Sequence, residues 1–242
     1  MKFIKEFFLM EEKNKNVSKI FLYNGVKYII NDDPYKERYY HAIFNPLTEG
    51  QINNLQDDVN EIQKSCYVFP DWYRIFLKTC NGMNLYFNSI SLYGDSDVIN
   101  DLPKYNDSAL LYELNKIPNF SPYNLRYTNS IKFYFESQNR WLVIGCYKYD
   151  GTQIVWDYKK NKIEAMYALP ATTSYKKLMR MTEEDYENMI ICEWSSFDEF
   201  LKNEMKRLSK VFSEYTDLKK IKNIDIQLSR KTLPIGHREY IK

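Results

Sequence analysis

Four aspartates gather in one turn-rich stretch and are the residues best placed to meet a charged partner. Asp95, Asp97, Asp101 and Asp107 are accompanied only by Lys104, so four negative charges and one positive charge leave a net −3. A carboxylate-bearing loop attracts a basic protein surface and mainly raises the rate of association. We take these four aspartates as candidate partner-binding residues, with an ordinary polar loop as the alternative.

Trp72 and Tyr73 form a second pair of candidates for partner binding. Large aromatic side chains often anchor protein interfaces. The same segment also carries Ile75 and Phe76, and on a helix at least part of this apolar set must face the core. Trp72 and Tyr73 are therefore candidates whose exposure decides their role.

Other residues give little support for catalysis. Only two histidines are present, His41 and His237, so one chain cannot supply three histidine ligands to a metal, and neither has a recognisable triad partner. Phosphate-binding, nucleophile-elbow and zinc-protease motifs are absent. Adjacent acids such as Asp57-Asp58 and Glu183-Glu184-Asp185 are typical of solvated or capping groups. We predict no enzyme activity, no cofactor, and no catalytic, cofactor-binding or metal-binding residues.

The composition is that of a folded protein of 242 residues, with 44% hydrophobic and 27% charged residues. A net charge of +2 creates no overall field toward nucleic acid or membrane, so a partner must be recognised locally. The four cysteines form no CxxC pair, which favours a reducing compartment. With no secretory signal and no run of about 18 apolar residues, we expect a cytoplasmic, soluble protein.

Three helices are predicted to position the candidates. Thr48 and Gln51 have the spacing of a capping box, before apolar residues at helical intervals, and predict a helix over 49–64. A proline in the first turn and Asn-Gly at the end bound a helix over 70–80. Ser196 and Glu199 repeat the capping spacing before a closing helix over 197–214.

The β-rich segments predict an antiparallel sheet. Asn24-Gly25 separates two of them and indicates a hairpin over 19–30. Two short strands or one bent strand are expected over 83–93, and four more runs between 131 and 167 read as a meander. This order predicts a single α+β domain with about four to six antiparallel strands covered by helices.

The expected organisation has three parts. Residues 1–45 form an N-terminal extension with a helix and the hairpin, and residues 46–215 form the main domain. Residues 216–242 form a basic tail, which we interpret as a solvated terminus, with a nucleic-acid-binding arm as the alternative.

Three blocks of sequence, taken in order, resemble the SUKH superfamily of Smi/Knr-like proteins. The first is 69–82, which contains a proline, aromatic residues, an apolar pair and Asn-Gly. The second joins the apolar strand 141–145 to 150–157, which ends in an aspartate. The third is 194–201, with the pattern Ser-Phe-x-x-Phe-Leu. The resemblance covers about two thirds of the chain, from 48 to 208.

The best-known members of this superfamily are bacterial immunity proteins that neutralise toxins, together with a yeast regulator of cell-wall synthesis. The resemblance implies a non-catalytic, intracellular protein-binding module whose partner is a secreted toxin or its C-terminal toxic domain, with no membrane partner and with nucleic acid disfavoured. The alternative is a nucleic-acid-binding or enzymatic protein whose site is scattered along the chain.

Overall fold

The computed structural model describes more than half of the chain. The described ranges are 2–13, 17–23, 26–31, 39–64, 66–86, 89–95, 140–147, 151–167 and 181–214. The first of the β-runs expected between 131 and 167, near 131–135, and the basic tail lie outside them.

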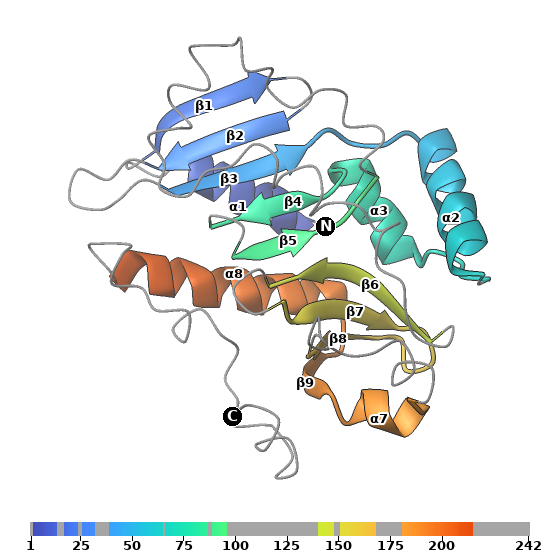
Figure 1. The fold of residues 1–242 in the computed structure, drawn as a ribbon. Coiled ribbons are helices and arrows are strands. Elements are labelled where there is room, and N and C mark those ends of the chain that lie inside the picture. The colour runs from blue at the N-terminus through green and yellow to red at the C-terminus, as the bar shows by residue number, and fades with distance from the viewer. Residues whose placement is uncertain are drawn as a thin grey trace.

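The described residues form five helices and nine strands (Figure 1). The helices are α1 (Lys2–Glu12), α2 (Glu49–Gln63), α3 (Asp71–Thr79), α7 (Glu183–Glu187) and α8 (Phe197–Glu214). The strands are β1 (Val17–Tyr23), β2 (Val26–Asn31), β3 (Tyr39–Phe44), β4 (Met83–Leu85), β5 (Ile90–Leu92), β6 (Trp141–Cys146), β7 (Gln153–Asp157), β8 (Lys162–Met166) and β9 (Ile190–Trp194).

All nine strands belong to one antiparallel sheet whose spatial order follows the chain order from β1 to β9. The α+β class with a single domain is confirmed, whereas the expected four to six strands are too few. Much of the difference lies near the N-terminus, where Ala42 and Ile43 of β3 pair with Asn84 and Met83 of β4. The N-terminal hairpin therefore continues the main sheet, and position 45 does not interrupt it.

The predicted helices match α2, α3 and α8 closely because their ends are specified locally. The Thr48 side chain accepts a hydrogen bond from the N–H of Gln51, whose own side chain accepts one from the N–H of Thr48, so the capping box is complete. At α8, Ser196 accepts from the N–H of Glu199 at 3.1 Å, and the Glu199 carboxylate accepts from the N–H of Ser195 at 2.9 Å.

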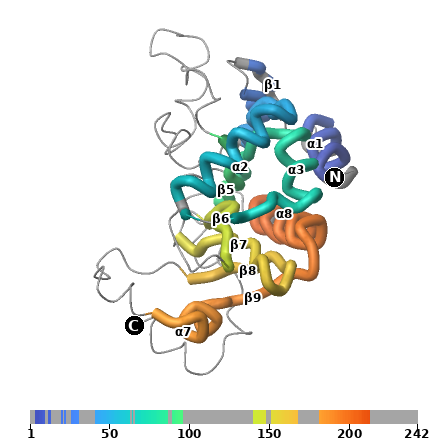
Figure 2. Tube along the Cα trace, turned by 90° about the vertical axis from the view of Figure 1, so that its right-hand side faces the viewer, coloured from blue at the N-terminus to red at the C-terminus, as the bar shows by residue number. Residues whose placement is uncertain are grey.

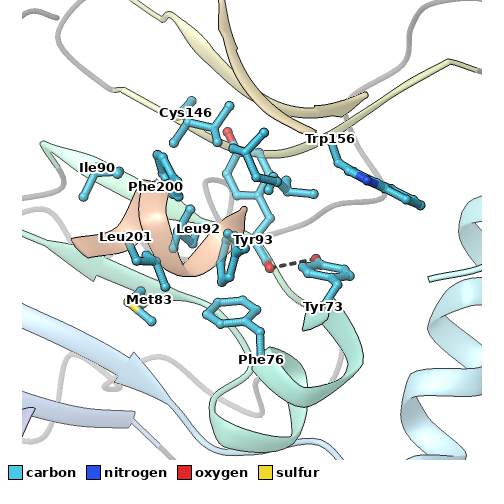
Figure 3. Packing of buried hydrophobic residues seen from close by; sticks show 14 of the residues in the cluster. Tyr73, Phe76, Met83, Ile90, Leu92, Tyr93, Cys146, Trp156, Phe200 and Leu201 are labelled. Carbon is cyan, nitrogen blue, oxygen red and sulfur yellow. Dashed lines mark hydrogen bonds between the residues drawn. The ribbon is translucent and has the colours of Figure 1, made fainter. Parts of the chain in front are cut away.

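Helices α1, α3 and α8 lie on one side of the central strands (Figures 1 and 2). Between α3, α8 and the sheet, Phe76, Met83, Leu92 and Leu201 are fully or almost fully buried in one apolar cluster (Figure 3). Burial of these side chains provides the main stabilisation of this layer. Among the described helices, none has the length and apolar character needed to cross a bilayer.

Candidate functional site

Helix α3 places Trp72 and Tyr73 in different environments. Tyr73 is only 1% exposed, and its hydroxyl donates to the carbonyl of Tyr93 at 3.0 Å, as the dashed line in Figure 3 shows. Trp72 is half-buried, and its ring stacks on Phe197 of α8 at 4.7 Å and meets Trp156 of β7 edge-on at 6.0 Å. Tyr73 is thus a core residue, whereas Trp72 keeps part of its ring at the surface.

Asp95 is fixed just after β5 by a clasp with Asn81, which follows α3. The N–H of Asp95 donates to Oδ1 of Asn81 at 2.6 Å, and Nδ2 of Asn81 donates to the carbonyl of Asp95 at 2.8 Å. The two segments approach so closely at Gly94 that a Cβ there would lie 2.5 Å from the carbonyl oxygen of Asn81. Only glycine fits this position without displacing the backbone.

The clasp also buries Asp95, which is 5% exposed. Burial raises the pKa of the Tyr73 hydroxyl well above its ordinary value, and the nearby Cys80 and Asp95 add to the effect. The structure therefore brings two candidates, Tyr73 and Asp95, into one neighbourhood. Their side chains offer almost no surface to a partner. The other three aspartates, Asp97, Asp101 and Asp107, lie outside the described residues.

Tyr158 and Val68 are two exposed side chains that were not predicted from the sequence as partner-binding residues. Tyr158, just after β7, is 47% exposed, and its ring contacts Trp156 at 5.3 Å and Tyr67 at 6.2 Å. Val68, beside Tyr67, is 64% exposed. The ring contacts run from the half-buried Trp72 through the buried Trp156 to the exposed Tyr158, and we call Val68, Trp72 and Tyr158 together the aromatic strip. The sequence signal for Tyr158 is weak, since it is only an aromatic residue two positions after Trp156.

A buried ionic cluster around Arg140, the residue before β6, is the second polar arrangement. Arg140 donates to Asp157 at 2.8 Å and forms ion pairs with Glu183 at 3.1 Å and Glu187 at 2.7 Å. Its guanidinium carbon lies 4.3 Å from the centre of the Trp141 ring. Arg140 thereby ties two strands of the sheet to α7, with its charge almost completely buried.

Glu164 joins the same cluster from β8. Its carboxylate accepts a hydrogen bond from the indole nitrogen of Trp141 at 2.9 Å and from Lys160 at 3.2 Å. Burial raises the pKa of Glu164 above its ordinary value, against the opposing effect of these donors. The carboxyl group is completely buried, as is that of Asp157.

Asp157 behaves differently although it is equally buried. Burial alone would raise its pKa, but the hydrogen bond from Arg140 and those from the backbone N–H groups of Lys160 and Lys159 outweigh that effect and lower the pKa. Asp157 is therefore held as the ionised counterion of Arg140. Since the oxygens of both carboxylates are engaged within the protein, the cluster acts as a tie between elements.

The acids around α7 also have structural partners. Asp185 completes a capping box with Thr182, and Glu183 pairs with Lys159 as well as with Arg140. These contacts agree with the capping interpretation of the Glu183-Glu184-Asp185 run. Within the described ranges, no three histidine, cysteine or acidic side chains are grouped so that they could hold a metal ion.

In comparisons with protein families, with curated proteins and with solved structures, no match to this chain was found.

Proposed function

We propose that this chain is a SUKH-like immunity protein, a non-catalytic module that neutralises a cognate bacterial toxin by stoichiometric binding. One observation carries the proposal. The three blocks that resemble the superfamily meet at Trp72: this residue belongs to the first block, Trp156 to the second and Phe197 to the third. Blocks far apart in the chain thus form one aromatic junction, as expected for segments that define a common fold.

The aromatic strip is the surface that we propose for the toxin. Rings such as the half-buried Trp72 and the exposed Tyr158 bury apolar area on binding at little entropic cost, and their backing by Trp156 and Phe197 fixes them before binding. The acidic stretch, including Asp97, Asp101 and Asp107, adds electrostatic attraction toward a basic toxin surface. Binding occupies or occludes the toxin, so no chemical step is required of this chain.

Co-expression with neighbouring toxins tests the function. The toxic C-terminal domain of each large secreted protein encoded beside this chain is expressed in a sensitive host with and without the chain. We expect one toxin to be neutralised and to form an equimolar complex by light scattering. Failure to rescue cells from every neighbouring toxin would contradict the immunity function.

Variants then test the surface separately from the function. Tyr158→Ala should weaken binding by about tenfold or more, as for a truncated aromatic anchor. Leu9→Ala, which truncates a similarly exposed apolar residue of helix α1, should leave binding unchanged. If the chain rescues cells and Tyr158→Ala does not weaken toxin binding, the toxin binds outside the aromatic strip.

The acidic stretch has its own readout. Replacing Asp97, Asp101 and Asp107 together with Asn removes three charges while keeping size and polarity. We expect slower association and a weaker dependence of the on-rate on ionic strength. Asp95 is left in place because it is buried in the clasp. An unchanged on-rate would remove the aspartates from the interface and leave the immunity function standing.

A further inference from the structure

Strand β1 forms one edge of the sheet in the described part of the chain. It pairs with β2 on one side and ends the strand order on the other. An edge strand presents a row of backbone N–H and C=O groups that can pair with another strand. The β1 edge is therefore a potential site of main-chain association.

Two apolar side chains on this edge strand are exposed. Leu22 is 75% exposed and Ile20 is 46% exposed, and their spacing of two residues puts them on the same face. Their cross-strand partners on β2 are Lys27 and Ile29. Ile29 is completely buried, and Lys27 is ion-paired with Glu12 of α1. On this face of the sheet, the buried region therefore ends at β2, and the apolar side chains of β1 are exposed.

The opposite edge of the sheet differs. Strand β9 carries Glu193, which is exposed and ion-paired with Lys162 of β8 at 2.6 Å. Natural proteins commonly protect edge strands with charges or proline. In its seven residues, β1 has one charged residue, Lys19, and no proline. Strand β9 likewise has one charged residue and no proline, so within the described residues the two edges differ in exposed apolar surface: β1 exposes Ile20 and Leu22, whereas the apolar side chains of β9 are buried or half-buried.

We propose that β1 pairs antiparallel with β1 of a second copy of this chain, about a twofold axis at Phe21. This register sets Ile20 opposite Leu22 of the second copy, and Leu22 opposite its Ile20. Each exposed leucine then packs beside an isoleucine that adjoins the buried Ile29, so the apolar row continues across the junction. A twofold pairing covers the β1 edge of each copy, so association through this edge stops at the dimer.

The size and charge of this edge indicate a dimer that dissociates on dilution. Seven residues at about 3.4 Å per residue give an edge of about 24 Å. Such a junction covers less than the roughly 800 Å² per partner of a standard interface. A formal charge of only +2 per chain gives little repulsion between copies. This association is independent of the proposed immunity function and can be tested without a toxin.

Sedimentation velocity over a wide range of protein concentration measures the association. We expect a monomer–dimer equilibrium for the full chain and, for Leu22→Lys, a dissociation constant raised by about tenfold or more, because the exposed apolar contact is replaced by charge. Val68→Lys is the matched control, since Val68 is similarly exposed but lies in the aromatic strip. A monomer at every concentration, or a dimer unaffected by Leu22→Lys, would overturn the proposal.

Cross-linking tests the register. Ile20→Cys and Leu22→Cys are prepared separately with Cys66→Ser, because Cys66 is exposed. Paired strands bring directly opposed residues within disulfide range. We expect a mixture of the two variants to form a disulfide-linked dimer on mild oxidation, and each alone to cross-link little. Efficient cross-linking of either variant with itself would overturn the register about Phe21.

Discussion

The centre of the sheet and its C-terminal part are held together by different forces. Under α3 and α8, the layer consists of apolar side chains such as Phe76, Leu92 and Leu201. Around Arg140, two buried carboxylates and a buried guanidinium join β6, β7 and β8 to α7. The apolar layer depends on shape and area, whereas the ionic cluster depends on protonation. The two regions should therefore respond differently to the same change in pH.

The largest effect is expected in the apolar layer. Leu201→Ala should lower the free energy of unfolding by roughly 2 to 5 kcal/mol, because Leu201 is 1% exposed and its truncation leaves a cavity. No ionisable group is removed, so the loss should be similar at pH 7 and pH 5. Urea unfolding measures it, with the exposed neighbour change Lys202→Ala as control. A loss below about 0.5 kcal/mol would mean that α8 does not bury this stripe.

In the ionic cluster, Asp157→Asn should lower the free energy of unfolding by about 3 kcal/mol at pH 7, because the buried Arg140 loses its main counterion. The folded-state pKa of Asp157 is lowered, so its stabilisation is present above the ordinary aspartate pKa and is lost as pH falls below about 4. The difference in unfolding free energy between wild type and variant should become smaller over that pH range. Asp57→Asn, on the exposed face of α2, serves as control. A difference in unfolding free energy that does not change with pH would contradict an ionised Asp157.

The clasp that fixes Asp95 gives a smaller, pH-independent effect. Gly94→Ala should lower stability by about 1 to 3 kcal/mol, since its Cβ would overlap Asn81. Gly50→Ala is a matched control with the opposite expected sign. A Cβ at Gly50, in α2, meets nothing within 4 Å, and alanine should stabilise the helix by about 0.5 to 1 kcal/mol. Thermal or urea unfolding of both variants gives the comparison. Equal changes in stability for the two variants would contradict the close approach of Gly94 to Asn81.

Glu164→Gln should have the smallest effect and a pH dependence opposite to that of Asp157. The folded-state pKa of Glu164 is raised, so wild type is penalised as pH rises above the ordinary glutamate pKa of about 4.5. Glutamine keeps an acceptor for Trp141 without the charge. Relative to wild type, the variant should therefore gain stability between pH 4 and pH 7, by about 1 kcal/mol or less. A relative loss over this range would show that Glu164 is stabilised as the anion.

The helices were predictable from the sequence because their signals are local. Thr48 and Gln51 are three residues apart, and the same holds for Ser196 and Glu199. The strand count was not predictable, because the N-terminal strands join the main sheet only where β3, which pairs with β2 along its length, also pairs with β4, some 40 residues further along the chain. A local pattern cannot reveal such a partner.

The candidate site shows the same division. Trp72 and Tyr73 are adjacent in the sequence, and only the helix geometry and the hydrogen bond to Tyr93 separate a half-exposed ring from a buried one. The burial of Asp95 depends on Asn81, 14 residues earlier. Arg140 gave no sequence signal at all, because its partners Asp157 and Glu187 lie on separate elements.

The strand order of the sheet has a consequence for synthesis of the chain. Since each strand from β2 to β9 pairs with the one made just before it, the sheet can grow strand by strand as the chain leaves the ribosome. Among the described elements, helix α8 is made last, so Leu201 and its neighbours are the last of them to cover the central layer. Until α8 has left the ribosome and packed against it, that apolar layer stays open to other nascent chains and to chaperones.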